Sequence, residues 1–563
     1  MMIDREKITR PLPRSAKTTL LAAAALTVVG HAAALAQSQS SGPGAPIQFR
    51  NDYFGYGLAL GPRVTYTDNI SLAPDGFRDD EFAAGIAADG AAIYSTNRFT
   101  GIIDGTLDVS YLTDQAELVA SQDVGAVGTA TISDNLFYVD IGASSSRQLA
   151  GEDARFSQNV NAGRNQRVDV HNVAASPYLN RRFADGSAAE LRYRFSQSLI
   201  EGDQGNFNQE IFDRNSRTQE VVATYDSGNA FSRLDMTLTA YGNKTRDYGS
   251  SVLTDYEYEQ GTLQGDFEFA VTDRFALAGT VGYDDVDTTA PASFIPEDEL
   301  TGVFWNAGFR AQPGRKTDIL LKYGRRYDDD FITGSLRYDI SPSIRFTASA
   351  GRTFQSRATS SATQYQALQR RTLDFVESLR ENGVGEAGGV VDALTRVARQ
   401  RFNVQQIGLG VSNNANASLA GVFGRTTVSL SAAYNDSDYG FRQIKSYGGS
   451  LGAQRALSRR MSAYTNIFWR RLEANSDLTA CIADPAQFFL DPTVPGFDPV
   501  GACNALVGFQ GDNDTVGGRI GLSYRVYKNV SAFGEFGHTE RFSQNPQFEY
   551  GENTVTAGLQ LEF

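Results

Sequence analysis

Short stretches in which apolar and polar residues alternate with a period of two recur along almost the whole of this sequence. In residues 99–111, for example, Ile103, Leu107 and Tyr111 share one parity, whereas Asp104 and Asp108 share the other. Because successive side chains of a β-strand point to opposite faces, each stretch predicts a strand with one apolar and one polar face. We therefore expect a chain that is almost entirely β-structure.

On many of these strands the charged residues fall on the polar parity. This predicts a sheet with its polar face around a water-filled interior and its apolar face toward lipid. The sheet must close, because lipid offers no hydrogen-bond partners to an open edge. The fold expected for residues 52–563 is an all-β, transmembrane antiparallel β-barrel of about 22 strands. A large soluble β-protein is the alternative, but it would not need so strict a separation of faces. The side chains expected to line the lumen are Asp104, Asp108, Asp140, Glu190, Arg192, Arg194, Asp235, Asp266, Glu268, Arg310, Lys322, Arg337, Arg345, Arg519 and Glu535.

The composition fits such a barrel better than a set of soluble domains. The chain has 55 Gly, 25 Tyr and 35 Phe but only two Cys, and its mean hydropathy is −0.32. Half of each barrel strand is polar, so the average resembles that of a soluble protein. The formal net charge of −14 argues against nucleic acid as a partner.

Short turn-forming segments alternate with longer polar segments along the chain. Short turns at one rim and long loops at the other are the plan of an outer-membrane barrel, with the short turns periplasmic. The long connections are expected at 146–166, 200–217, 243–253, 285–301, 435–445, 472–513 and 539–549.

Residues 1–36 predict a secretory signal peptide. Basic residues between Arg5 and Lys17 precede a short apolar run, and Ala34 and Ala36 form a cleavage motif of small residues. The run is too short and too rich in alanine for a convincing membrane helix. Cleavage is expected near Ala36, and residues 37–51 are expected to form a flexible linker rich in Ser, Gly and Pro.

The C-terminal strand resembles the closing strand of bacterial outer-membrane barrels. Its apolar parity includes Leu559, Leu561 and the terminal Phe563. The resemblance implies that these residues form the signal that the barrel-assembly machinery recognises. It also implies that the lipid of the outer membrane surrounds the folded protein.

One segment, at 361–402, departs from the alternation. Leu368, Phe375 and Leu379 follow helical spacing, and Leu394 belongs to a second helical stretch. We expect a helical hairpin inserted between two strands at the extracellular rim. Two interpretations stay open: the hairpin folds into the lumen and gates it, or it lies outside as a docking element.

The two cysteines, Cys481 and Cys503, lie in the same long segment, 472–513. In an exported chain a disulfide within this loop is the natural interpretation, and two free thiols are the alternative.

The opening strand carries a more specific signature. Residues 63–74 read RVTYTDNISLAP, and a helical segment precedes the last strands at 369–402. Both features resemble a family of outer-membrane β-barrel porins associated with PEP-CTERM and exopolysaccharide systems. The resemblance implies a pore linked to exopolysaccharide and its export proteins, and it supplies no catalytic residues. A general diffusion porin for small solutes and a non-conducting structural or binding barrel are the alternatives.

The motifs of other classes do not match. His171 and His538 are far apart in the sequence, and no nucleophile motif or phosphate loop accompanies them, so we expect no enzyme activity and no cofactor. The acidic runs at 328–330 and 512–514 lack the spacing of a calcium loop and are expected to be solvated. A siderophore-type transporter would require a folded plug before the first strand, where the sequence predicts only the linker.

Overall fold

The computed structural model describes residues 48–49, 53–149, 154–202, 214–228, 230–249, 256–289, 295–356, 409–440, 442–476, 478–483, 485, 492, 496–507 and 512–563. The expected signal peptide, 1–36, and the expected helical insertion, 361–402, lie outside these residues. Most of the expected linker, 37–51, does so as well.

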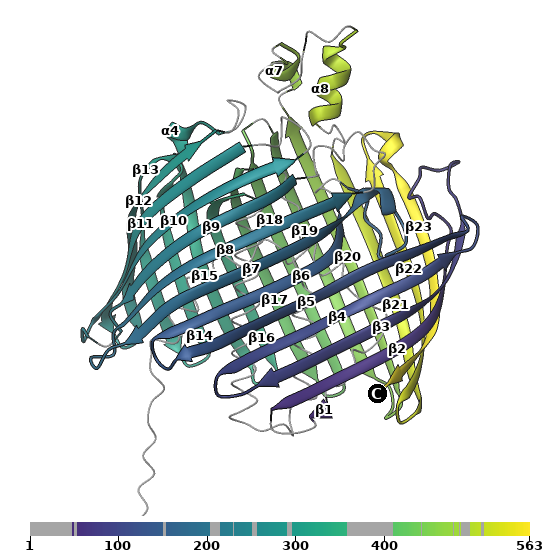
Figure 1. The fold of residues 1–563 in the computed structure, drawn as a ribbon, viewed down its shortest axis with the longest axis horizontal. Helices are drawn as coiled ribbons and strands as arrows, with labels where there is room; N and C mark the ends of the chain where they lie inside the picture. The colour runs from purple at the N-terminus through teal and green to yellow at the C-terminus, as the bar shows by residue number, and fades with distance from the viewer. Residues whose placement is uncertain are drawn as a thin grey trace, which may run out of the picture.

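The chain forms one antiparallel sheet that closes on itself (Figure 1). Each strand from β2 to β22 pairs with the next in sequence, and β23 pairs with β2, so the barrel has 22 strands as predicted. The additional strand, β1, pairs with β2 alone. The strands are β1 (Gln48–Phe49), β2 (Phe54–Thr67), β3 (Glu81–Ser95), β4 (Phe99–Leu112), β5 (Glu117–Ser133), β6 (Phe137–Leu149), β7 (Arg167–Arg182), β8 (Ala188–Gly202), β9 (Arg214–Asp226), β10 (Leu234–Gly249), β11 (Tyr256–Thr272), β12 (Phe275–Thr288), β13 (Gly302–Gly314), β14 (Thr317–Arg326), β15 (Asp329–Ser341), β16 (Ile344–Gln355), β17 (Gly410–Phe423), β18 (Thr426–Asp438), β19 (Arg442–Ala456), β20 (Met461–Ser476), β21 (Asn513–Tyr527), β22 (Val530–Ser543) and β23 (Tyr550–Glu562).

The alternation that predicted the strands separates the two faces of the barrel. On β4, Ile103 and Leu107 are 50% and 47% exposed, whereas Asp104 and Asp108 are 7% and 4% exposed. The apolar parity therefore points outward and the polar parity points into the lumen. The outward-facing apolar side chains form a surface suited to lipid. Closure of the sheet gives each strand a hydrogen-bonded neighbour on both sides.

The two rims differ. Short turns such as 273–274, 315–316 and 528–529 lie at the lower rim in Figure 1, where the C-terminus also lies. The upper rim carries the longer connections, together with the short helices α4 (Glu297–Leu300), α7 (Leu478–Ala483) and α8 (Pro499–Val507). Cys481 of α7 and Cys503 of α8 are joined by a disulfide, with a Cα–Cα distance of 5.8 Å. Among the described residues, no helix is both long and apolar enough to cross a membrane.

Several strands extend further than the sequence predicted. The expected loop at 243–253 is largely strand, because β10 continues to Gly249, and the expected loop at 435–445 reduces to a tight turn between β18 and β19. Beyond the apolar band, the outer faces of these extensions carry charged side chains. Lys244 on β10, for example, pairs with Glu257 and Glu259 on β11.

The seam of the barrel includes part of the expected linker. β23 pairs with the upper part of β2, and the amide of Phe563 donates to the carbonyl of Leu58. Below that point β1 pairs with β2 in place of β23, with Gln48 opposite Tyr56. The linker therefore contains a two-residue strand that continues the ladder past the C-terminus.

Candidate functional site: the polar inner wall

The charged residues predicted to line the lumen all occupy inward-facing positions of their strands. Most of them divide into three ion-paired groups on neighbouring strands and three smaller ion-paired sets elsewhere, because neighbouring strands hold side chains of the same face side by side. Asp104 on β4 and Asp235 on β10 face inward as well.

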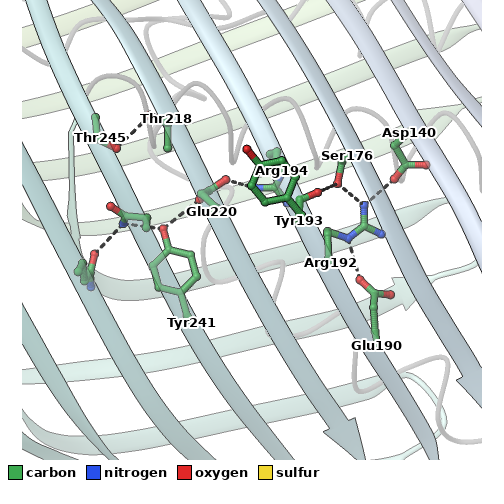
Figure 2. A network of polar contacts seen from close by, with 12 residues as sticks. Asp140, Ser176, Glu190, Arg192, Tyr193, Arg194, Thr218, Glu220, Tyr241 and Thr245 are labelled. Atoms are coloured by element: carbon green, nitrogen blue, oxygen red, sulfur yellow. Dashed lines mark hydrogen bonds and ion pairs between the residues drawn. The ribbon is translucent and has the colours of Figure 1, made fainter.

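The first group centres on Arg192 of β8. Its guanidinium donates to Asp140 on β6 at 2.6 Å, to Glu190 on its own strand at 2.7 Å and to the hydroxyl of Ser176 on β7 at 3.1 Å (Figure 2). It also lies 3.7 Å from the ring centroid of Tyr178. Arg192 carries one positive charge and its two partners, Asp140 and Glu190, carry one negative charge each. The formal charge of the group is therefore −1.

A second group lies beside it. Arg194 of β8 donates to Glu220 of β9 at 2.6 Å, and both side chains are more than nine-tenths buried. The hydroxyl of Tyr241 on β10 donates to the other oxygen of Glu220 at 2.9 Å (Figure 2). Asn243 in turn donates to the hydroxyl of Tyr241 at 2.8 Å. The planar fork of arginine suits such fixed pairs better than lysine does.

A third group lies on β11 to β14. Arg310 donates to Asp318 at 2.8 Å and to Glu268 at 3.3 Å. Lys322 donates to the hydroxyl of Thr280 at 2.7 Å and lies 3.5 Å from Asp266.

The remaining predicted residues lie apart from these groups. Arg337 and Arg345 share Asp339 at 3.1 and 2.6 Å, and both arginines are more than half exposed. Arg519 lies 3.6 Å from Glu535, which also accepts a hydrogen bond from Tyr464.

Sequence reasoning missed two inward-facing ion pairs. Arg326 donates two hydrogen bonds, of 2.7 and 2.8 Å, to the carboxylate of Asp284, and its guanidinium lies 4.1 Å from the ring centroid of Phe304. Arg63 pairs with Asp108. The parity of Arg63 is visible in the sequence. Arg326 is the last residue of β14, and Asp284 directly precedes the expected loop at 285–301.

A loop lies inside the upper rim. We call residues 154–166, which connect β6 to β7, the strap. Its Phe156 makes an edge-on contact with Phe468 of β20, at 5.3 Å between ring centroids. The hydroxyl of Tyr550 on β23 bridges the backbone of Phe156, and Ser157 donates to Glu552. The strap follows β6 and is held at β23 and β20. Because β2 to β5 separate β6 from β23, and β21 and β22 separate β23 from β20, the strap spans part of the barrel's upper opening.

The strap also contacts the loop between β2 and β3. The amide of Gly163 donates to Ile70 at 2.9 Å, and Arg155 donates to the carbonyl of Leu72 at the same distance. Burial lowers the pKa of Arg155 from its usual value. The strap is therefore held to three separate parts of the barrel.

The histidines and acidic runs form no reactive constellation. His171 and His538 lie on the outer face, and His538 contacts Asn553 at 2.9 Å. Asp328, Asp329 and Asp330 each contact a different side chain, from Arg325, Arg352 and Tyr323 respectively. Within the part of the chain that the structure describes, no group of three or more His, Cys, Asp or Glu side chains is arranged to hold a metal ion.

A closed antiparallel barrel with an apolar exterior and a polar interior is the architecture of outer-membrane β-barrels. This chain is an outer-membrane β-barrel. Its inner wall is polar and charge-paired in the part of the chain that the structure describes.

No protein-family profile and no curated protein matches the sequence. Among solved structures, the chain is similar to the siderophore receptor PirA of Pseudomonas aeruginosa, with 10% identity over 92% of this chain and 81% of that one, and a TM-score of 0.38. The Ferric-Catecholate import receptor Fiu of E. coli K12 gives 10% identity over 92% and 82%, with a TM-score of 0.47. A loop-deletion mutant of OmpT, an outer membrane protein of Vibrio cholerae, gives 9% identity over 91% and 100%, with a TM-score of 0.29.

Proposed function

We propose that the protein is an outer-membrane pore that passes a hydrated, neutral or weakly charged exopolysaccharide. The observation that carries the proposal is the pairing of charges on the inner wall. The cations of the groups around Arg192, Arg194 and Arg310 each lie within hydrogen-bonding distance of a carboxylate. A wall of mixed, paired charges presents no strong barrier of one sign, so it suits a chain that is itself close to neutral.

The link to exopolysaccharide rests on the opening-strand signature, RVTYTDNISLAP, and on its resemblance to barrels of polysaccharide export systems. The expected partners are therefore the polymer, its export proteins and the barrel-assembly machinery. Secretion through a signal peptide cleaved near Ala36 belongs to the same proposal.

A general diffusion porin for small solutes is the second candidate. The strap favours it, because Phe156 and Phe468 meet across the inner side of the upper rim and reduce the free cross-section there. A barrel narrowed in this way would pass small sugars but hold back a polymer.

The two functions are separated by size. Purified full-length protein is reconstituted into liposomes, and swelling rates are compared for glucose, stachyose and neutral dextrans of increasing length. In parallel, secreted and surface polysaccharide is quantified in the native host after deletion of the gene and after complementation. Passage of dextrans and loss of secreted polymer are the expected results. A cut-off at small oligosaccharides with normal polymer secretion would favour the diffusion porin, and absence of any swelling would favour a structural barrel.

A further inference from the structure

One part of the inner wall is without charge. We call the inward-facing positions of β16 to β19 between Arg345, near the lower rim, and Arg442, near the upper rim, the uncharged wall. β17 contains no charged residue at all, and the acidic residues of β18, Asp436 and Asp438, have the outward parity. The ion-paired groups lie on β6 to β9 and on β11 to β14, so the lumen has chemically distinct sides.

Hydroxyl and amide groups line the uncharged wall in rows that follow the register of the strands. In one row, Thr347 contacts Ser418 at 2.7 Å, and Ser431 contacts Ser450 at the same distance. In the next row upward, Asn416 donates to Ser349 at 3.0 Å. Each of these groups can donate and accept hydrogen bonds.

The following row contains unsatisfied amides. Asn414 and Asn435 lie opposite each other on β17 and β18. Both side-chain polar atoms of Asn414, which is 4% exposed, lack a hydrogen-bond partner among the described residues, as do the oxygen of Asn435 and the hydroxyl of the nearby Thr353. The nitrogen of Asn435 donates to Ser437 at 2.8 Å. A buried polar group without a partner is costly, so this row is prepared for a ligand that brings its own donors and acceptors.

The chemistry of the wall selects the class of ligand. An ion would find no opposite charge there, and an apolar ligand would leave the amides unsatisfied. The hydroxyl groups of a neutral sugar match both the carbonyl and the amino group of an asparagine.

We propose that the uncharged wall is a binding track for a neutral, hydroxyl-rich oligosaccharide or polysaccharide segment, with Asn414 and Asn435 as its principal contacts. The proposal rests on the pore function proposed above and names the side of the lumen that the glycan follows.

The test measures equilibrium binding to the full-length protein in lipid nanodiscs. The probes are fluorescently labelled maltohexaose and cellohexaose, with labelled hexagalacturonate as an anionic comparison. The variant Asn414→Leu/Asn435→Leu removes the amides with little change in volume, and Asn306→Leu is the matched control. Asn306 is also a buried, inward-facing amide with an unpartnered oxygen, but it lies on β13 in the charged part of the wall. Barrel folding of each variant is verified by heat-modifiable migration.

We expect the wild type and Asn306→Leu to bind at least one neutral hexamer more tightly than hexagalacturonate. The double variant should bind it about tenfold more weakly, as expected for the loss of a pair of hydrogen bonds. Equal binding by the double variant and the wild type, or no binding of either neutral hexamer, would overturn the track.

A conductance measurement on the same preparations tests the proposed pore function separately from the proposed binding track. Binding that depends on the two asparagines in a barrel without conductance would retain the track and refute the pore. Conductance with binding unaffected by the double substitution would retain the pore and refute the track.

Discussion

At the scale of residues, the depth of an ion pair decides what its loss should cost. Arg194 and Glu220 are both more than nine-tenths buried, and Tyr241 also donates to Glu220. Arg345 pairs with Asp339 but is more than half exposed. Exposed pairs contribute little, whereas removal of one partner of a buried pair leaves an uncompensated charge.

We therefore expect Arg194→Leu to lower the free energy of unfolding by about 3–5 kcal/mol, and Arg345→Leu by at most about 1 kcal/mol. Urea unfolding in lipid vesicles, followed by tryptophan fluorescence, measures both changes. The double variant Arg194→Leu/Glu220→Leu should recover most of the loss, because no charge is left unpaired. A single variant as stable as wild type would contradict this account of the pair.

At the scale of elements, local alternation predicts strands well and contacts between distant segments poorly. The parity of Ile103 and Asp104 was enough to place both on the correct faces. The strap was expected only as part of a long loop, because nothing near Phe156 in the sequence indicates that it meets Phe468, which is distant in the chain.

The uncharged wall was missed for a related reason. In the sequence, charged residues mark the inner face of a strand, and β17 contains none. Serine, asparagine and alanine also differ too little in polarity to give strong alternation. The paired charges were accessible from the sequence, but the rows of Thr347, Ser418 and Ser431 required the register between strands.

The anchoring of the strap can be tested at Tyr550. Its hydroxyl accepts from the amide of Phe156 at 2.8 Å and donates to the carbonyl of the same residue at 2.5 Å. Tyr550→Phe should leave both groups unpaired and weaken the strap by about 1–3 kcal/mol. Hydrogen exchange of peptides covering 154–166 should accelerate by roughly tenfold to a hundredfold. Tyr524→Phe, at an exposed position on the outer face of β21, is the control and should leave that exchange unchanged.

The disulfide belongs to the loop rather than to the barrel. Cys481 and Cys503 are 22 residues apart, and the two helices that carry them lie above the rim (Figure 1). Cys481→Ser/Cys503→Ser should leave the heat-modifiable migration of the barrel intact while making the loop between β20 and β21 more sensitive to protease. In the chain-entropy model the closed loop is constrained by about 3 kcal/mol. Barrel assembly that fails without the cysteines would show that the strands depend on this loop.

At the scale of the whole molecule, closure depends on the last strand. β23 pairs with both β22 and β2, and its Leu559 and Phe563 face outward at 44% and 53% exposure. The sequence predicted the strand number, the closure and the two faces, because each follows from a repeated local pattern. It did not predict that Gln48 and Phe49 would extend the seam, since two residues are too few to show alternation.

Deletion of Phe563 should reduce the yield of folded barrel in the outer membrane, because we expect the assembly machinery to recognise this strand. The measurement is the heat-modifiable fraction of the protein in isolated outer membranes. The control variant is Phe542→Ala, which removes an exposed, outward-facing phenylalanine near the C-terminal end of β22. An unchanged yield after deletion of Phe563 would argue against its role as a signal.

The strap gives the barrel a mechanical cross-brace. A barrel pulled from its C-terminal end by an atomic force microscope is expected to leave the membrane one hairpin at a time. Here the first hairpin, β22 and β23, is tied through Tyr550 and Glu552 to a loop that belongs to β6 and β7. The first rupture should therefore require more force than those that follow, and Tyr550→Phe should lower that first peak selectively.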